Sequence, residues 1–310
     1  MANTTITRRN LIVDKKKVNV LGYSVWLFFM VIIGFIMTYP FVFSFLGSLM
    51  RADDFGQNLG VIIPEPIIPL YLRNLTLALR RTGLPPLLNT IARTTWYTVI
   101  ICLKALLMGY VMARYEFKLK NTLFILIISS QVIPGILTLL PTFVMASNIP
   151  LVGGNDIMGQ GGRGLINSRA MLYLPLSWNY LIWVFLMMQS LKGLPPDFEE
   201  AAEIDGASFM HIIFKIVLPM QLPILAVIAV NVALFTWNDW LTPFLYISDP
   251  MRSTLPAWVG QLTARLQEFG DRNYPRVFGL GTMATLPPFF IFLFLQKYIL
   301  QGIASAGIKG

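Results

Sequence analysis

Residues 194–223 read LPPDFEEAAEIDGASFMHIIFKIVLPMQLP and differ from the rest of the chain, which is mostly apolar. Proline lacks the N–H that a helix interior requires, so Pro195 and Pro196 predict the end of the preceding apolar segment. Asp197 and Glu200 have the Asp-x-x-Glu spacing of a capping box, which predicts a new short helix. Acidic residues in its first turn face the positive end of the helix dipole. The stretch therefore predicts a polar helix between apolar segments.

A glycine divides this stretch into two helices. Gly206 follows Asp205 and supplies the left-handed conformation with which many helices end. Beyond it, apolar residues at helical spacing predict a second, amphipathic helix that runs to Pro219 and has these residues on one face: Phe209, Ile212, Ile213, Ile216 and Val217. Two short helices that meet at a glycine predict a compact polar knob.

The composition is that of a multispanning membrane protein. Of 310 residues, 55% are hydrophobic and 13% charged, and the mean hydropathy is +0.65. The net charge is +9, but no basic run is interleaved with aromatic residues, which argues against nucleic acid as a partner. Cys102 and His211 are the only residues of their kinds. Because the chain has one cysteine and one histidine, the sequence excludes a disulfide framework, a cysteine or histidine metal cluster and a histidine-paired catalytic dyad within the chain.

We expect six membrane spans. The predicted spans, good to a few residues at each end, cover residues 23–49, 89–112, 123–145, 171–191, 223–246 and 278–300. Residues 1–22 form a basic leader, and residues 301–310 form a tail. Pro134, Gly135 and Pro141 predict a kinked third span.

The loops between these spans have different predicted roles. Residues 51–87 and 147–169 form external segments, of which the second is glycine-rich, and the knob at 194–220 lies on the inner side. Gly159, Gly161 and Gly164 of the segment 147–169 have the Gly-x-Gly-x-x-Gly spacing of a dinucleotide-binding turn. No buried strand precedes them, so we interpret residues 147–169 as a turn-rich loop.

The lysines give the predicted orientation, because short loops that face the cytoplasm carry an excess of positive charge. All lysines except Lys104 fall on one side of the proposed topology: Lys15, Lys16, Lys17, Lys118, Lys120, Lys192, Lys215, Lys297 and Lys309. Both termini and the knob are therefore expected in the cytoplasm.

The knob also carries a resemblance to a known family. Glu200-Ala201-Ala202, three residues, Gly206, nine residues and then Ile216-Val217-Leu218-Pro219 resembles the EAA motif of bacterial ABC-importer permeases. The rest of the chain resembles the carbohydrate-uptake branch, in particular the maltose-type (MalG-like) permeases. The residues that carry this second resemblance are Asn89-Thr90, Gly109 to Arg114, Trp237-Asn238-Asp239 and the C-terminal Gly307 to Gly310. The glycine-rich loop at 147–169 is longer than in the maltose subunit.

The resemblance implies a type I ABC importer permease: an all-α integral membrane protein of six transmembrane helices with a cytoplasmic coupling helix, in the bacterial inner membrane. It implies partners as well, namely a second homologous permease, two copies of an ATP-binding subunit, an extracytoplasmic sugar-binding protein and membrane lipid. ATP and Mg would be bound by the ATPase subunits, and no cofactor, metal or catalytic residue is expected in this chain. The sequence agrees, since it has no Gly-x-x-x-x-Gly-Lys-Ser/Thr phosphate loop.

In the family, the first short helix of the motif docks in a cleft of the ATPase and transmits its closure to the spans. The resemblance therefore implies ATPase-coupling roles for Glu199, Glu200, Ala201, Ala202, Asp205, Gly206 and Ala207. Glu200 and Gly206 are the strongest candidates, and the tail is a further candidate contact with the ATPase.

Polar residues inside the spans are candidates for the substrate pathway, because burial in lipid makes them energetically expensive. Lys104 lies near the middle of the second span, Gln131 lies in the third, and Trp237, Asn238 and Asp239 lie in the fifth. An aromatic ring beside amide and carboxylate groups suits a sugar, whose C–H face stacks while its hydroxyls form hydrogen bonds. The alternative for each is structural, as a pair or hydrogen bond between helices.

Two other classes of function remain as alternatives. An ATP-independent secondary sugar carrier would show inverted repeats and coupling-ion carboxylates, and no clear repeat is present. An intramembrane enzyme would need a nucleophile with a base or paired carboxylates in the spans. The sequence leaves open whether the saccharide is neutral or acidic, such as a uronate oligomer of the alginate type.

Overall fold

The computed structural model describes residues 20–57, 71–77, 83–174, 178–269 and 273–307, and every regular element among them is a helix. The all-α prediction is therefore confirmed for this part of the chain. The chain divides into two units, residues 1–43 and residues 44–310. The first contains most of α1 (Val20–Ser48), an apolar helix whose side chains are mostly exposed over residues 22–43.

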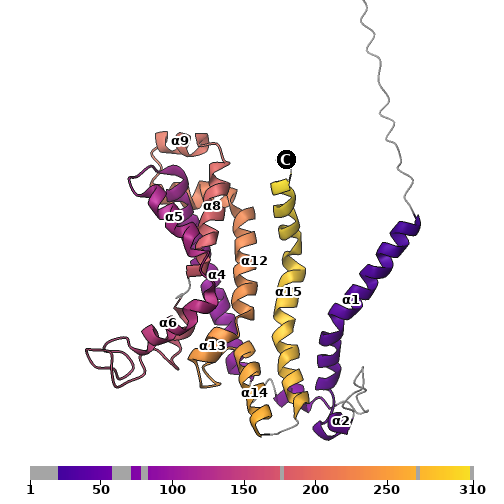
Figure 1. Cartoon of the computed structure of the whole chain (residues 1–310). Coiled ribbons are helices and arrows are strands. Elements are labelled where there is room, and N and C mark those ends of the chain that lie inside the picture. Colours follow the sequence, from indigo (N-terminus) through magenta and orange to yellow (C-terminus); the bar gives the residue numbers. More distant parts are fainter. Residues whose placement is uncertain (1–19, 58–70, 78–82, 175–177, 270–272, 308–310) are drawn as a thin grey trace, which may run out of the picture. The chain divides into compact units, whose positions relative to one another are not determined.

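The second unit contains the remaining helices. They are α2 (Ala52–Gln57), α3 (Arg73–Leu77), α4 (Leu84–Arg114), α5 (Lys120–Ser130), α6 (Gly135–Ser147), α7 (Ala170–Tyr173), η2 (Trp178–Leu181), α8 (Ile182–Lys192), α9 (Asp197–Ile204), α10 (Phe209–His211), η3 (Ile212–Val217), α11 (Leu218–Met220), α12 (Leu222–Asn238), α13 (Leu241–Tyr246), α14 (Leu255–Phe269) and α15 (Tyr274–Gly307). In Figure 1, α9 lies across the upper end of α8. α13 and α14 lie toward the lower end of α12.

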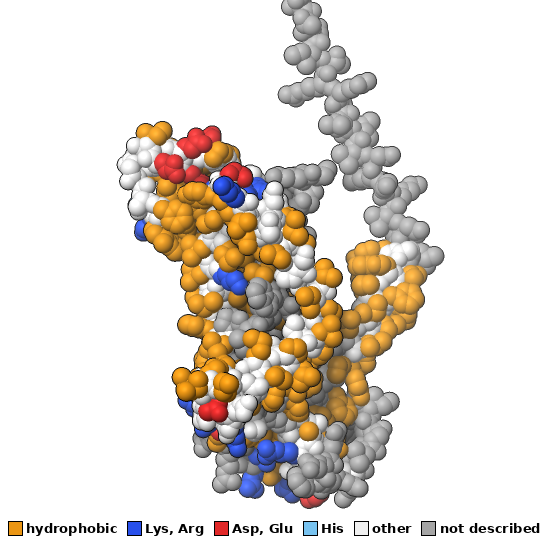
Figure 2. All heavy atoms as spheres, turned by 60° about the vertical axis from the view of Figure 1, so that its left-hand side comes forward, with side chains coloured by type: hydrophobic (Ala, Val, Ile, Leu, Met, Phe, Trp, Pro, Cys, Tyr) orange, Lys and Arg blue, Asp and Glu red, His pale blue; other side chains and the backbone are white. Residues whose placement is uncertain are grey.

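The core of this unit is built around α4, which packs against α8 and α12, while α12 also packs against α15. Ile101, Leu106 and Tyr110 of α4 are buried among side chains of α8, η3 and α12. Gly109 permits the close approach of α8, because a Cβ there would lie 2.7 Å from Cγ of Met187. The resulting face of the unit is mostly hydrophobic between two ends where charged side chains gather (Figure 2).

Three described helices are long and apolar enough to cross a membrane: residues 22–48 of α1, the whole of α4 and residues 274–293 of α15. The number rises to five if each of two bent helix pairs is one span. α4 and α15 extend beyond the predicted second and sixth spans, at 89–112 and 278–300.

The predicted third span, at 123–145, is two helices rather than one kinked helix. α5 and α6 meet at an angle of 100°. Pro134 is the N-cap of α6, and proline disfavours helical conformation in the residue before it, so the break falls here. Pro141, by contrast, lies inside α6.

The predicted fourth and fifth spans are also interrupted. The segment 171–191 contains α7, η2 and the eleven-residue α8 in place of one helix. The segment 223–246 is divided at Asp239 and Trp240, where α12 ends and α13 begins.

The segment between the predicted fifth and sixth spans, for which the sequence predicts no helix, contains α14. Its apolar side chains Leu255, Trp258 and Leu262 are buried against Val277 and Leu280 of α15. The segment from 51 to 87 likewise contains α2, α3 and the start of α4. Asn89 and Thr90 of α4 hold the chain before α14, because the Asn89 amide donates to the carbonyls of Met251 and Ser253 and the Thr90 hydroxyl accepts from the Leu255 N–H.

The glycine-rich loop at 147–169 is an ordered turn-rich structure. The Asn155 amide donates to the carbonyls of Ser147 and Ile149 at 2.8 and 2.9 Å, and its oxygen accepts from the Gly162 N–H. Five of its glycines have positive φ: Gly153, Gly154, Gly159, Gly161 and Gly164. No strand precedes them in the described chain, so they do not form a dinucleotide-binding turn.

Candidate functional site

The knob is fastened to the end of α4 by an ion pair. The Arg114 guanidinium donates to Glu199 through Nε at 2.9 Å and through Nη2 at 2.7 Å. Nη2 also donates to the Leu194 carbonyl at 3.2 Å. Both side chains are largely buried. A two-pronged Arg–carboxylate pair fixes orientation as well as distance, so α9 is held rigidly on the second long helix.

The two neighbouring glutamates of the motif have different environments. Glu199 is buried under Arg114, whereas Glu200 is exposed. The outer side of α9 also exposes two apolar residues, Phe198 at 57% and Ile204 at 87%. Figure 2 shows acidic and hydrophobic side chains together at this end of the molecule. The outer side of α9 is therefore an exposed surface of polar and apolar side chains.

The start of α9 differs from the predicted capping box. Pro196 is the N-cap and Asp197 the first helical residue, and neither makes a side-chain cap bond. The N–H groups of Glu199 and Glu200 donate instead to the Pro196 carbonyl. Proline in this position places Asp197 and Glu200 one residue too far into the helix to cap it.

The end of α9 matches the glycine cap that the sequence predicts. Gly206 has φ of +80°. Its N–H donates to the Glu203 carbonyl, and the Ala207 N–H donates to the Ala202 carbonyl at 2.9 Å. This pair of bonds is a Schellman motif after the C-cap residue Asp205. A Cβ on Gly206 would meet nothing within 4 Å, so backbone strain, not crowding, limits this position.

The remaining knob residues connect α9 to the core. Ala201 is exposed, while Ala202 and Ala207 pack against the buried cluster. The predicted amphipathic helix after Gly206 contains a π-helical segment, η3, between two short α-helical turns. Ile212, Ile213 and Val217 are buried as predicted. Phe209 is 40% exposed and stacks edge-on with Tyr110 of α4.

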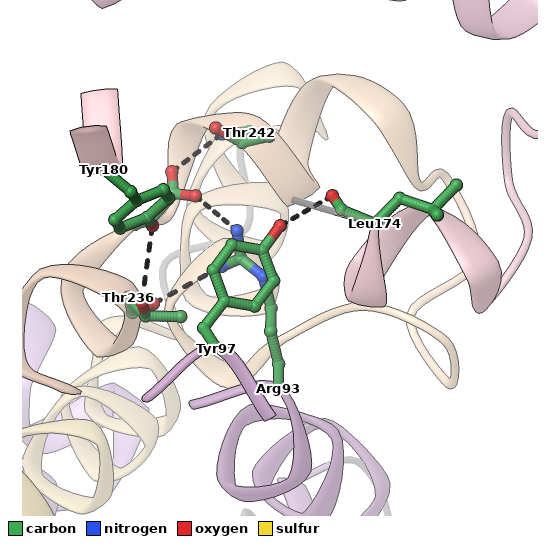
Figure 3. A network of polar contacts seen from close by, with 7 residues as sticks. Arg93, Tyr97, Leu174, Tyr180, Thr236 and Thr242 are labelled. Atoms are coloured by element: carbon green, nitrogen blue, oxygen red, sulfur yellow. Dashed lines mark hydrogen bonds and ion pairs between the residues drawn. The ribbon is translucent and has the colours of Figure 1, made fainter. Parts of the chain in front are cut away.

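A second group of polar residues lies around the α12–α13 break. Arg93 of α4 forms a 2.6 Å ion pair with Asp239 and donates to the Thr236 carbonyl at 3.3 Å. Tyr97 lies one turn along α4, under the guanidinium, and donates to the Leu174 carbonyl. Figure 3 shows Tyr180 of η2 and Thr236 of α12 converging on Arg93 and Tyr97 of α4.

This network forms one wall of a cavity of about 360 Å³. Its lining comes from α4, α6, α7, η2, α12 and α13, and includes Thr138, Thr142, Thr242, Phe235 and Tyr246 beside the network itself. The volume lies at the lower end of the range for small-molecule sites, roughly 300–1,000 Å³.

The structure brings only one of the predicted pathway residues to this cavity, Asp239. Trp237 is buried and its indole donates to the Ala284 carbonyl of α15 at 2.9 Å, which is the structural alternative. Asn238 is exposed and lines a neighbouring, more open hollow with Asn231 and Trp240. Gln131 lies at the α5–α6 bend and donates to the Ser130 hydroxyl. Lys104 is half-buried on α4, and within the described chain it has no hydrogen bond or ion pair.

Sequence reasoning missed Arg93 and the role of Arg114. Arg93 is a charge inside a predicted span, which is the same signal that singled out Lys104. Arg114 is named in the sequence analysis only within the Gly109 to Arg114 stretch, without a binding partner. Their partners, Asp239 and Glu199, lie 146 and 85 residues away along the chain.

Comparison with known proteins agrees with this architecture. Residues 105–305 match the model of the binding-protein-dependent transport system inner membrane component family. The chain belongs to this family. The resemblance of residues 200–219 to the permease motif is thereby confirmed, and the secondary-carrier alternative finds no support.

Individual proteins of known name are similar to this chain over most of its length. It is 29% identical over 282 residues to the arabinooligosaccharides transport system permease protein AraQ of Halalkalibacterium halodurans, covering 90% of this chain and 93% of that protein. It is 30% identical over 275 residues to the melibiose/raffinose/stachyose import permease protein MelC of Bacillus subtilis, covering 87% and 91%. A solved chain of a bacterial ABC transporter that imports the acidic polysaccharide alginate has the same fold, with a TM-score of 0.73, 18% identity and coverage of 91% and 98%.

Proposed function

We propose that this family member is the permease subunit of an ABC importer for an oligosaccharide, driven by a separate ATPase. Two similar permeases carry names of neutral oligosaccharides, arabinooligosaccharides and the melibiose/raffinose/stachyose group. Both are similar over at least 87% of this chain.

The observation that carries the coupling role is the clamped helix α9. Its inner side is fixed to α4 through Glu199 and Arg114, and its outer side exposes Glu200, Phe198 and Ile204. Such a rigid and exposed lever suits docking in a cleft of an ATPase subunit. Movement of the ATPase would then reach the long helices through Arg114, with no flexible segment between them.

The proposed assembly has two permeases, this chain and a homologous partner, with two ATP-binding subunits that bind ATP and Mg. An extracytoplasmic binding protein delivers sugar, as a periplasmic protein is seen in complex with the alginate transporter. We place the chain in the bacterial inner membrane with six spans, in which the broken segments α5–α6 and α7–α8 are the third and fourth. Both termini and α9 face the cytoplasm, and the last turns of α15 lie toward the same end as α9 (Figure 1).

The mechanism that follows is alternating access. ATP binding closes the ATPase pair, the α9 helices of both permeases move with it, and the pair changes from inward-open to outward-open. Hydrolysis of ATP then resets the complex. Asp239 and the neighbouring Asn238 are the proposed pathway residues in this chain, while Trp237 joins α12 to α15.

ATP-dependent uptake by the reconstituted four-subunit complex with its binding protein tests this function. Labelled raffinose and arabinotriose should accumulate in proteoliposomes only when ATP is enclosed on the α9 side. Uptake that persists without the ATPase subunits would show a secondary carrier instead. Co-purification of the tagged chain with an ATP-binding subunit and a second permease is the accompanying biochemical result.

A further inference from the structure

The cavity beside Arg93 has the chemistry of a sugar site. We infer that it is a saccharide subsite selective for uncharged over acidic sugars, an inference that rests on the proposed permease function. Four aromatic rings, those of Tyr97, Tyr180, Phe235 and Tyr246, line it together with the hydroxyls of Thr138, Thr142 and Thr242. Aromatic faces pack against the C–H face of a sugar, and hydroxyls exchange hydrogen bonds with its own hydroxyls.

The aromatic residues are fixed in place. The hydroxyl of Tyr97 donates to the Leu174 carbonyl at 2.8 Å, and that of Tyr246 donates to the Leu139 carbonyl at 2.8 Å. Phe235 also belongs to the lining and is 64% exposed. The tyrosines form rigid walls, and the threonines and Asp239 supply the polar contacts.

The charges of the cavity determine its selectivity. Among the described residues of the lining, only Arg93 and Asp239 are charged, and they neutralise each other at 2.6 Å. The exposed fraction of the Arg93 side chain is 4%, whereas that of Asp239 is 21%. The accessible member of the pair is therefore the carboxylate, and the cation lies behind it.

This arrangement has opposite consequences for the two classes of sugar. Asp239 uses Oδ2 for Arg93 and Oδ1 for the Thr242 N–H, yet each carboxylate oxygen has two acceptor sites. A sugar hydroxyl can therefore donate to Asp239. A uronate carboxylate in the same place meets a negative charge at short range, and the Arg93 guanidinium, whose two Nη atoms donate to Asp239 and to the Thr236 carbonyl, is buried behind that charge.

Direct binding to the assembled complex without its binding protein tests the inference, because the binding protein imposes its own selectivity on uptake. Labelled raffinose and a labelled mannuronate trisaccharide are each equilibrated with the complex in nanodiscs, and their Kd values are compared. We expect raffinose to bind at least about tenfold more tightly, as expected for like charges a few ångströms apart in a partly buried site. The Asp239→Asn variant exposes an uncompensated Arg93, so this ratio should fall by about tenfold or reverse.

Two further variants make the result specific. Glu116→Gln removes an equally charged carboxylate from an exposed ion pair with Lys120 outside the cavity, and the ratio should stay unchanged. Thr242→Val removes a hydroxyl from the lining but keeps the backbone bond to Asp239. It should weaken raffinose binding severalfold, and it serves as the test if Asp239→Asn does not assemble.

The outcomes separate this inference from the proposed function. Equal or tighter binding of the trisaccharide by the wild-type complex, or a ratio unmoved by Asp239→Asn, overturns the selectivity while sugar import stands. Raffinose binding unaffected by Thr242→Val overturns the location of the subsite. If the complex takes up no saccharide in the presence of ATP, the proposed function itself is overturned.

Discussion

Arg114 is the residue on which the attachment of the knob depends. Its fork contacts both the Glu199 carboxylate and the Leu194 carbonyl. Lysine carries the same charge on a flexible stem and cannot reproduce two parallel donors. Charge alone therefore does not hold α9 in its orientation.

The Arg114→Lys variant should assemble with its partners but transport poorly. The loss of one charge-assisted hydrogen bond, worth about 1.5–3 kcal/mol, loosens α9 on α4 without removing the charge. We expect uptake to fall severalfold while ATPase activity falls less, so that more ATP is consumed for each sugar. A fixed ratio of the two rates would mean that Arg114 has a purely structural role. Lys120→Arg, in an exposed pair with Glu116, is the matched control.

Gly206→Val tests the cap at the end of α9. The site has room for a side chain but holds φ at +80°, where a β-branched residue is strained by roughly 1–2 kcal/mol. We expect α9 to reorient and ATP-driven uptake to be lost in the purified complex. Gly34→Val is the control, since Gly34 has equally open space in the helical backbone of α1. Normal uptake and normal ATPase activity in Gly206→Val would contradict the coupling role of α9.

At the scale of elements, α4 and α8 approach each other closely at Gly109. A Cβ on Gly109 would lie 2.7 and 2.9 Å from atoms of Met187 and 3.2 Å from the backbone nitrogen of Met188. The Gly109→Leu variant should therefore push α8 away from α4 and destabilise the unit by about 1–3 kcal/mol. A fall in the melting temperature of the purified complex measures this. An unchanged melting temperature would mean that the close contact between α4 and α8 does not contribute to the stability of the complex.

The elements also show what the sequence determines locally. Residues 197–217 could be predicted closely because caps, glycine turns and helical periodicity depend on neighbours within a few residues: the helix, the left-handed Gly206 and the buried face of Ile212, Ile213 and Val217 are all present. The exception is the capping box. The helix begins at Asp197 as predicted, but the capping box places the N-cap on Asp197, whereas the structure places it on Pro196.

Features that depend on distant partners could not be predicted. The signal at Pro134 and Gly135 identifies a break but not its angle of 100°. The pairing of Arg93 with Asp239 joins α4 to the α12–α13 break across 146 residues. α14 was missed because its apolar side chains find their partners in α15, and an amphipathic stretch of moderate polarity looks like loop until that partner is known.

At the scale of the whole molecule, the proposed topology can be tested with the chain's own single cysteine removed. In a Cys102→Ala background, Ser208→Cys on the knob should react with a membrane-impermeant maleimide only from the cytoplasmic side. Met158→Cys, at a 79% exposed position in the glycine-rich loop, should react only from the outside. Labelling of both from the same side would refute the predicted orientation. The Cys102→Ala protein, which has no cysteine, is treated in the same way and serves as the background control.

The unbroken helix α4 couples the binding free energies of two sites, the contact with α9 and the cavity beside Arg93. Arg93 and Arg114 lie 21 residues apart on one helix, or roughly 30 Å at 1.5 Å per residue, with a carboxylate from another element held at each. Any shift of α9 that changes the inclination of this helix changes the cavity wall as well. Linkage then requires reciprocity: if nucleotide binding alters sugar affinity by some factor, sugar alters nucleotide affinity by the same factor. Raffinose should therefore change the apparent Kd for ATP in the complex, by an amount that can be computed in advance from the sugar Kd measured with and without nucleotide.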